Sequence, residues 1–268
     1  DRNQVVTLYG PEKDGFKLPS NEEVEQAILT AQSQTYEAPK EEKVPAKLMP
    51  VLPRKGKIVS EKEVSNGYRE FTLSNGMRVY ARQTDFKADN ISMYLFSPGG
   101  KNVYPDSDMP SMQYLASVIN SSGVAGFSES TLEKMLAGKQ VSVSPYLSDE
   151  TEGMRGSSSV KDFETMLQLT YLYFTSPRRD DEVFQSMMNR QASFLTNRDM
   201  SPNVQYNDSV VSILYGNHPR QAPVKKEDLS KVSLDRIMQI YAERFANAGD
   251  FSVILTGSMD MKKLRPLL

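Results

Sequence analysis

A chain of 268 residues with 38% hydrophobic and 25% charged residues can bury a substantial core and has an ordinary globular composition. Its 32 basic and 34 acidic residues are interspersed and give a formal net charge of -2, which argues against a nucleic-acid partner, because such proteins usually carry a basic stripe. No apolar run approaches the roughly 20 residues of a membrane span, and no signal peptide pattern is visible, so no membrane partner is expected.

The cysteine and histidine counts limit the chemistry further. There is no cysteine, which excludes disulfides, thiolate nucleophiles and thiolate metal sites. His218 is the single histidine. Zinc sites in proteins are built mainly from histidine and cysteine, and one imidazole cannot supply one. We therefore expect no metal ligand and no cofactor in this chain.

The first 36 residues predict a strand followed by a helix. Residues 4–9 alternate and are rich in β-branched side chains, as in an edge or final strand. Ser20 is followed three positions later by Glu23, which is a capping box. Apolar residues at helical spacing behind it predict a helix near 21–33.

Residues 37–60 have the composition of a linker. Four prolines break the segment amid lysines and glutamates, so neither a helix nor a central strand is expected there. These prolines are Pro39, Pro45, Pro50 and Pro53. The apolar residues Leu48, Met49, Val51 and Leu52 indicate that the linker docks on an apolar surface.

Strands dominate the next part of the chain. A hairpin is predicted over residues 70–81, with Asn75-Gly76 supplying the positive φ angles of its turn. A further strand at 90–97 is ended by Pro98. Residues 140–147 and 151–160 alternate and predict a second antiparallel hairpin.

Helices follow, with one strand near the end. Their predicted ranges are 110–120, 129–137, 161–175, 180–198, 203–214 and 233–246, and the final strand is predicted over 251–255. Strands that come early and helices that come late indicate an α+β fold, in which helices pack on one face of a largely antiparallel sheet.

Four segments, taken in this order and at these spacings, resemble the repeated domain of the insulin-degrading-enzyme, pitrilysin and mitochondrial-processing-peptidase family. The resemblance covers about three quarters of the chain, residues 68–268, and implies a processing-peptidase-like metallohydrolase fold. The segments are Thr72-Leu73-Ser74-Asn75-Gly76-Met77-Arg78-Val79, Ser97-Pro98-Gly99-Gly100, Leu214-Tyr215-Gly216-Asn217-His218-Pro219-Arg220 and Val253-Ile254-Leu255-Thr256-Gly257-Ser258-Met259-Asp260.

The resemblance also implies a domain organisation. Residues 1–36 are expected to be the end of a preceding repeat, and 37–60 the connector between two halves of such an enzyme. Residues 61–268 are expected to form a degenerate peptidase-like domain. Both ends look cut, and the final segment resembles a helix barely begun, so we expect this domain to be incomplete at its C-terminus.

Family members are inverzincins, in which a helix carries His-x-x-Glu-His and a later helix supplies an acidic ligand. The resemblance places Gln113 and Ser117 where the histidines would be, and Ala116 where the glutamate would be. The later helix, residues 183–198, contains no acidic residue. The implied catalytic and metal-ligand sets of this chain are therefore empty, and zinc is expected in the catalytic half of the parent protein.

The same helix has a structural interpretation that needs no active site. Met112, Leu115, Ala116 and Ile119 recur at i, i+3, i+4 and i+7, which is the spacing of a core-facing stripe. We expect core packing here.

Other signals also have structural explanations. His218, between Asn217 and Pro219, is expected to order a loop, and Ser128 to cap the following helix. Gly99-Gly100 is expected to end a strand. An independent hydrolase that uses Ser128 and His218 is a third hypothesis.

Two clusters of charged side chains also stand out. Asp106 and Asp108 could contact calcium, but their loop lacks the further oxygen ligands of a dedicated site. The charged residues 178–182 open a helix and are expected to be a solvated surface.

The function implied is that of a non-catalytic structural and substrate-chamber domain of a larger zinc metallopeptidase that acts on peptides or unfolded proteins. This chain alone is not expected to be an enzyme, whereas its parent is expected to be a zinc metalloendopeptidase. The implied partners are the catalytic half of the same polypeptide and a peptide substrate. A periplasmic or cell-envelope localisation is implied only by the resemblance to the family.

The alternative function is a stand-alone protein- or peptide-binding scaffold derived from an inactive peptidase subunit. A His-x-x-Glu-His segment upstream in the same gene would favour the first function, and its absence the second. One further hypothesis places substrate on the strand at 140–147, because the edge of a sheet can accept an extended peptide by strand addition.

Overall fold

The computed structural model describes residues 5–10, 17–35, 44–198 and 200–268. It divides into two units, Asp1–Lys43 and Val44–Leu268, which are described separately below. Among the described residues, no helix has both the length and the apolar character that crossing a membrane requires.

The first unit contains the predicted helix, α1 (Asn21–Ser33). Its capping box is confirmed, because Glu23 N donates to Ser20 Oγ at 3.2 Å and Ser20 N donates to the Glu23 carboxylate at 2.7 Å. The strand predicted at 4–9 is wrong for the part described, since residues 5–10 form no strand. Residue 4 lies outside the described residues. Alternation alone does not make a strand, because a strand also needs a hydrogen-bonded neighbour.

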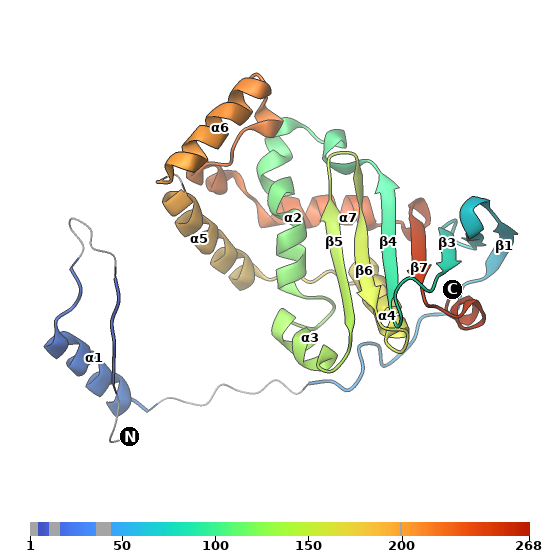
Figure 1. Ribbon diagram of the computed structural model, residues 1–268, viewed down its shortest axis with the longest axis horizontal. Coiled ribbons are helices and arrows are strands. Elements are labelled where there is room, and N and C mark those ends of the chain that lie inside the picture. Colours follow the sequence, from blue (N-terminus) through green and yellow to red (C-terminus); the bar gives the residue numbers. More distant parts are fainter. Residues whose placement is uncertain (1–4, 11–16, 36–43, 199) are drawn as a thin grey trace. The chain divides into compact units, whose positions relative to one another are not determined.

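The second unit is organised around a seven-stranded sheet with the order β1-β2-β3-β7-β4-β6-β5 (Figure 1). Neighbouring strands are antiparallel except for β3 and β7, which are parallel. The strands are β1 (Ile58–Glu63), β2 (Arg69–Leu73), β3 (Arg78–Gln83), β4 (Ile91–Pro98), β5 (Val141–Leu147), β6 (Thr151–Ser158) and β7 (Ser252–Gly257).

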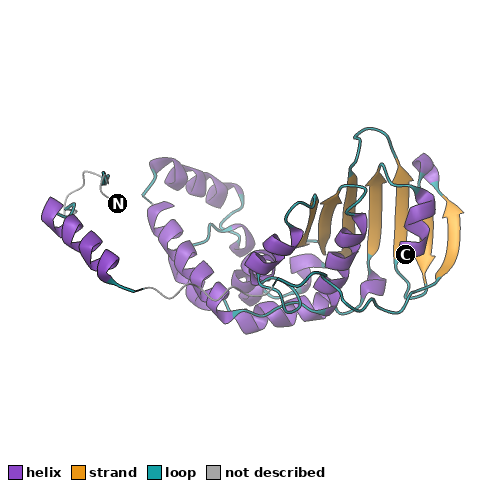
Figure 2. Ribbon diagram, turned by 90° about the horizontal axis from the view of Figure 1, so that it is seen from below, coloured by secondary structure: helices purple, strands orange, loops and turns teal. Residues whose placement is uncertain are grey.

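The main helices gather on one side of this sheet, as Figure 2 shows. The predicted α+β fold with a largely antiparallel sheet is therefore confirmed. The helices are α2 (Met109–Ser122), α3 (Glu129–Leu136), α4 (Phe163–Thr175), α5 (Asp181–Arg198), α6 (Pro202–Leu214), α7 (Leu234–Phe245) and the short α8 (Met261–Leu264).

Alternation along the central strands decides which face is buried. Met93 and Leu95 of β4, and Val253 and Leu255 of β7, are all at most 5% exposed and lie on the helix side. The intervening residues point to the opposite face, because successive side chains of a strand alternate. The core therefore lies between the sheet and the helices.

The helices supply the other half of the core. Leu115 and Ile119 of α2 are 0% exposed, as are Ile237 and Ile240 of α7. Burying one such side chain contributes about 1.5–3 kcal/mol relative to leaving it exposed. These contacts fix α2 and α7 on the sheet and so determine which faces of α2 remain available to solvent.

The turn of the first hairpin differs from the prediction. Only Gly76 has a positive φ, 96°, whereas Asn75 does not. Gly76 N donates to the Leu73 carbonyl at 2.9 Å, and Asn75 Oδ1 accepts from Met77 N at 3.1 Å. The loop is thus longer than the two-residue Asn-Gly turn, and the asparagine acts through its side chain.

The segment that precedes β1 has no regular secondary structure at residues 44–57. Leu48 is 8% exposed and joins the core, and Met49 packs against it. Val51 and Leu52 are 82% and 60% exposed. Docking of the linker on an apolar surface is therefore confirmed at its first two apolar residues and wrong for the last two. Residues 37–43 of the predicted linker lie outside the described residues.

Candidate functional site

Helix α2 is the element that the resemblance assigns to the zinc motif. Met112, Leu115 and Ile119 are buried at 1%, 0% and 0% exposure, as the apolar spacing predicts. Gln113 and Ser117 are exposed, one turn apart on the same face. Ala116 is half-buried and lies at the margin of the core stripe. The three positions therefore form an accessible strip along α2.

The chemistry of this strip does not fit zinc. An amide and a neutral hydroxyl are poor ligands for zinc, which prefers imidazole, thiolate and carboxylate, and a methyl group cannot accept a proton. Helix α5 packs against α2 but carries no acidic residue from Val183 to Arg198. Within the described ranges, no cluster of three or more histidine, cysteine, aspartate or glutamate side chains could hold a metal ion.

The side of the sheet that faces away from α2, α4 and α7 is here called the open face. Its central row joins five strands in direct register: Tyr80 of β3, Ile254 of β7, Tyr94 of β4, Arg155 of β6 and Ser144 of β5. Side chains in such a row are direct cross-strand neighbours. The open face is thus a continuous surface rather than a set of separate loops.

Aromatic rings and one arginine dominate the β4–β6–β5 end of the open face. The Tyr94 and Tyr146 rings stack with centroids 5.8 Å apart and planes at 7°, and Tyr94 also stacks on Phe96 at 5.5 Å. The Arg155 guanidinium lies over Tyr146 at 5.1 Å and over Tyr94 at 5.8 Å. A hydrogen bond of 3.0 Å joins the two tyrosine hydroxyls.

Gly153 makes this arrangement possible. It stands directly opposite Tyr146 in the β5–β6 register. A Cβ at Gly153 would come within 1.8 Å of the Leu95 carbonyl oxygen, so a side chain there would force β4 and β6 apart. The Tyr146 hydroxyl instead reaches the Leu95 carbonyl at 3.4 Å. Burial, followed by the bond to Tyr94, raises the pKa of Tyr146, which is therefore neutral at physiological pH.

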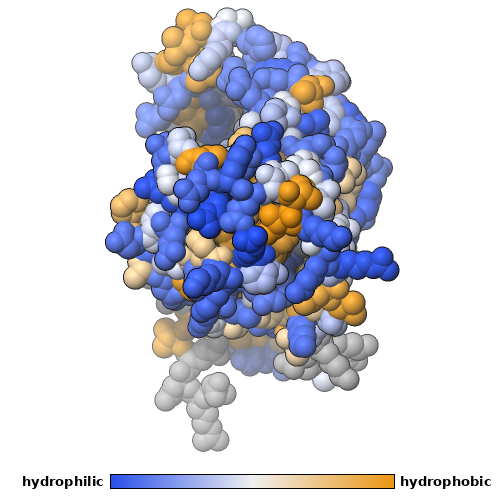
Figure 3. Space-filling model, turned by 90° about the vertical axis from the view of Figure 1, so that its right-hand side faces the viewer, coloured by the Kyte–Doolittle hydropathy of each residue, from blue (hydrophilic) through white to orange (hydrophobic). Residues whose placement is uncertain are grey.

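Charge on the open face is mainly positive. Alternation along the strands places four basic side chains and one acidic side chain there: Lys62, Arg78, Arg82, Arg155 and Glu70. Lys62 pairs with Glu70 at 3.2 Å. The side of the molecule on which β1 lies is largely hydrophilic, with separate apolar patches (Figure 3). The excess of arginine is local, because the whole chain has a net charge of -2.

The end of β4 is held by a buried ion pair. Glu152 of β6 is 0% exposed and binds Arg244 of α7, and its other oxygen accepts from Gly100 N at 2.6 Å. Arg244 also donates to the Pro98 carbonyl at 3.0 Å. The Gly99-Gly100 pair is therefore a strand end, as predicted, and its glycines allow the arginine and the turn after β5 to approach closely.

His218 orders a loop, in line with the prediction. Its Nδ1 accepts from Arg220 N at 3.3 Å. Arg220 then extends to the loop after β4, where it binds the Tyr104 carbonyl at 2.6 Å and Asp106 at 2.7 Å. The motif that includes His218 thus supplies Arg220, which fixes the loop after β4.

Asp108, the second carboxylate considered for calcium, binds the Arg236 guanidinium at 2.6 Å. Arg236 also lies over the Tyr104 ring at 5.3 Å. Burial and a hydrogen bond to Glu243 raise the pKa of Tyr104 above its ordinary value. Because arginine already holds both Asp106 and Asp108, these residues are structural anchors.

The serine considered for hydrolysis is a helix cap. Ser128 Oγ accepts from Thr131 N at 3.2 Å, which confirms the predicted N-cap of α3. In the described part of the chain, no hydrogen bond joins Ser128 to His218. The structure does not assemble a nucleophile and a base from these two residues.

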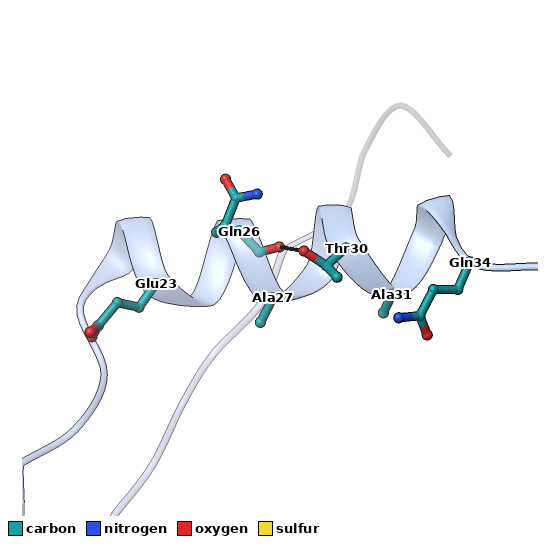
Figure 4. Close-up of a pocket in the computed structure, with 6 residues that line it drawn as sticks. All are labelled: Glu23, Gln26, Ala27, Thr30, Ala31 and Gln34. Atoms are coloured by element: carbon teal, nitrogen blue, oxygen red, sulfur yellow. Dashed lines mark hydrogen bonds between the residues drawn. The ribbon is translucent and has the colours of Figure 1, made fainter.

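A shallow depression on α1 is lined by one helix only: Glu23, Gln26, Ala27, Thr30, Ala31 and Gln34. Figure 4 shows these side chains along the helix and the 2.7 Å bond from Thr30 Oγ1 to the Gln26 carbonyl. Residues of a single helix surface do not enclose a ligand, so this depression is not a candidate site.

Strand β5 is an outer strand of the sheet, as the strand-addition hypothesis requires. The Ser148 N–H binds the Thr151 carbonyl at 2.8 Å, which fixes the hydrogen-bonded pairs of this hairpin. By alternation, Pro145 falls at a non-hydrogen-bonded position, so its nitrogen faces outward. A strand added to this edge would gain no N–H donor from Pro145, which is a common protection of edge strands.

Sequence analysis missed two features of this region. The Arg155–Tyr94–Tyr146 cluster joins three strands, and no local pattern reports such a contact. The alternation in residues 151–160 placed Arg155 on one face, but the partner strands were needed to identify its neighbours. The buried Glu152–Arg244 pair was missed for the same reason, because its residues are 92 positions apart.

Comparison with known proteins shows what this fold is similar to. No protein-family model matches the chain. It is 27% identical over 230 residues to a zinc protease PQQL-like protein of Arabidopsis thaliana, covering 85% of this chain and 22% of that protein. The chain spans less than a quarter of the curated relatives that it matches.

Solved structures show the same fold. The periplasmic protease PqqL from Escherichia coli superposes with a TM-score of 0.70 at 19% identity, over 91% of this chain and 27% of that one. A peptidase M16 inactive domain from Pseudomonas fluorescens gives 0.60 at 16% identity, over 75% and 48%.

The fold and the sequence are similar to those of one group of peptidases. The seven-stranded sheet with its one-sided helical layer is the fold of these peptidases. The sequence relatives carry zinc-protease names. The four motifs occur in the family's order. In sequence and fold the chain is similar to zinc proteases of the insulin-degrading-enzyme, pitrilysin and mitochondrial-processing-peptidase family, an M16 inactive domain included.

Proposed function

We propose that this chain is a non-catalytic domain of a larger zinc metallopeptidase and forms part of the wall of its substrate chamber. The exposed strip of α2 carries this proposal. Gln113, Ala116 and Ser117 are accessible where the family's zinc motif would stand, yet they offer neither a metal ligand nor a base. The likeness to an M16 inactive domain supports the same role.

The wall itself is the open face of the sheet. A sheet covered by helices on one side has its other side free to face a substrate or a partner. Half-exposed aromatic rings at Tyr94, Phe96 and Tyr146 give this surface an affinity for polypeptide, because the rings offer apolar area and the two tyrosines add hydroxyl groups. The substrates proposed for the parent protein are peptides or unfolded proteins.

The domain organisation is part of the proposal. Residues 1–36 would end a preceding repeat, 37–60 would connect two halves, and 61–268 would form the non-catalytic domain. Zinc would be held by the catalytic half of the same polypeptide. A periplasmic location is carried over from the protease PqqL of Escherichia coli.

The proposal is tested by cleavage in trans. Peptide cleavage by the catalytic portion of the same gene product is measured with and without this chain, and zinc is determined in each. We expect the chain alone to be zinc-free and inert, and to raise cleavage by its partner. Zinc binding or cleavage by the chain alone would overturn the proposal.

The same experiment separates the alternative function. A stand-alone scaffold would bind peptide but leave cleavage by the catalytic portion unchanged. The likeness to zinc proteases many times longer than this chain favours the chamber role.

A further inference from the structure

We propose that the open face binds an acidic segment of an extended polypeptide, with Arg155 at the centre of the site. This inference rests on the proposed chamber function, which supplies the polypeptide as a substrate. It adds that the wall binds acidic segments in preference to others. Arg155, Tyr94 and Tyr146 form the central cluster, and Arg78 and Arg82 extend the site across the sheet.

Arg155 is free to bind an anion. Its side chain is exposed, and within the described residues its guanidinium contacts two aromatic rings and makes no ion pair. By contrast, Arg220 and Arg236 of the same unit each form an ion pair with an aspartate. The planar fork of Arg155 can therefore accept a carboxylate in two parallel hydrogen bonds.

The two tyrosines prepare this arginine for binding. Their stacked rings and the 3.0 Å bond between their hydroxyls fix a platform on which the guanidinium lies. A side chain that is already ordered loses less conformational entropy when it binds. Tyr146 leaves the charge of Arg155 uncancelled, because burial raises the pKa of its hydroxyl.

Arg78 and Arg82 extend the positive surface. Both lie on β3, two residues before and two residues after Tyr80. Tyr80 stands in the same cross-strand row as Arg155. In the described part of the chain neither forms an ion pair, and Arg82 lies over the Tyr68 ring at 5.8 Å. Strands β3 and β6 are three strand spacings apart, which is roughly 14 Å. About four residues of an extended chain span that distance.

An acidic polypeptide fits this surface better than a neighbouring domain does. Covering the face with a closely packed domain would bury three arginines that form no ion pair among the described residues, and unpaired buried charges are strongly unfavourable. Hydroxyl groups at Ser144, Ser157 and Thr256 add hydrogen-bonding capacity but little apolar area. Charge complementarity therefore points to a hydrated, acidic chain segment.

The test is binding of a short labelled peptide rich in glutamate, followed by fluorescence anisotropy with the full chain. Its counterpart has glutamine at the same positions. We expect the acidic peptide to bind more tightly, and its affinity to fall with added salt, because the charges are exposed to solvent. Equal binding of both peptides would overturn the inference.

Single variants locate the site. Arg155→Gln should weaken binding of the acidic peptide by about fivefold, and Arg155→Lys should retain part of the affinity. The matched control is Arg190→Gln, which removes an exposed arginine of α5 and should leave binding unchanged. Equal effects of Arg155→Gln and Arg190→Gln would place the acidic peptide elsewhere. Melting temperatures establish that each variant is folded.

Two further outcomes separate this inference from the chamber function. If the catalytic portion is stimulated equally by the natural chain and the Arg155→Gln variant on an acidic peptide, the chamber role stands and the acidic site is wrong. If the acidic peptide binds through Arg155 without any stimulation of cleavage, the acidic site stands and the chamber role fails. A photo-crosslinker at Ser144 should capture the acidic peptide. Capture of the catalytic portion with exclusion of the peptide would overturn the inference.

Discussion

Arg244 of α7 and Glu152 of β6 form an ion pair that joins the helical layer to the end of the sheet. The side chain of Glu152 is 0% exposed and that of Arg244 is 25% exposed. The same carboxylate accepts the Gly100 N–H, so one side chain fixes both a helix and the turn after β4.

Glu152→Ala is expected to destabilise the chain by about 1.5–3 kcal/mol, because the substitution leaves Arg244 and the Gly100 N–H without their charged acceptor. The control is Glu150→Ala, an exposed position two residues away, which should change stability by less than about 0.5 kcal/mol. Urea denaturation of both variants measures the difference. Similar midpoints for the two would show that the buried pair contributes nothing.

Gly100→Ala is expected to destabilise the strand end. Gly100 has a φ of 65°, and a Cβ there would lie 2.5 Å from the Asp149 carbonyl oxygen. The left-handed conformation alone costs a non-glycine residue about 1–2 kcal/mol. Gly126→Ala is the matched control, since nothing lies within 4 Å of its added Cβ. A thermal shift no larger for Gly100→Ala than for Gly126→Ala would contradict this account.

A pair of histidines tests the geometry of α2. Gln113 and Ser117 are exposed and one turn apart, so Gln113→His combined with Ser117→His should create a two-imidazole zinc clamp. Free zinc at tenfold its Kd would stabilise the folded double variant by about 1.4 kcal/mol. The natural chain and the single variant Gln113→His should respond much less. A double variant that zinc does not stabilise would show that the two positions do not share a face.

The carboxylate of Asp180 is expected to make the free energy of unfolding fall at acid pH. A backbone hydrogen bond from Val183 and the charge of Arg178 hold the pKa of Asp180 below its usual 3.8, despite an opposing effect of burial. The charged carboxylate therefore stabilises the fold above the unfolded pKa. That stabilisation is lost as pH falls through the lower, folded pKa.

Asp180→Asn keeps an oxygen for the Val183 N–H and removes the titration. The free energy of unfolding should differ more between the natural chain and this variant at neutral pH than at about pH 3. A difference that does not change with pH would rule out Asp180 as the titrating group.

The charged segment 178–182 is only partly the solvated surface that its sequence predicts. Arg179 and Asp181 pair with each other at the surface. Arg178, however, is 29% exposed, binds Asp180 at 2.6 Å and donates to the Ser122 carbonyl at 2.7 Å. This second contact ties the start of α5 to the end of α2, and it joins residues 56 positions apart that no local pattern relates.

Local patterns in the sequence were sufficient to predict most of the helices and strands of this protein. The stripe of Met112, Leu115 and Ile119 placed α2 against the core, and the alternation of residues 140–160 produced β5 and β6. Caps at Ser20 and Ser128 were identified because a helix N-terminus needs nearby side-chain acceptors. These signals act within a few residues, so the sequence alone carries them.

Only the tertiary structure decided which side chains meet. The strand expected at residues 4–9 shows the limit of local pattern, since pairing depends on a distant segment. The Arg155 cluster needs β4, β5 and β6 in one register, and the Glu152–Arg244 pair needs α7 packed over the sheet. The sequence determined whether each segment could form a helix or a strand. The open face and its charge were determined by the order and register of the strands, because order and register arise from contacts between residues far apart in the chain.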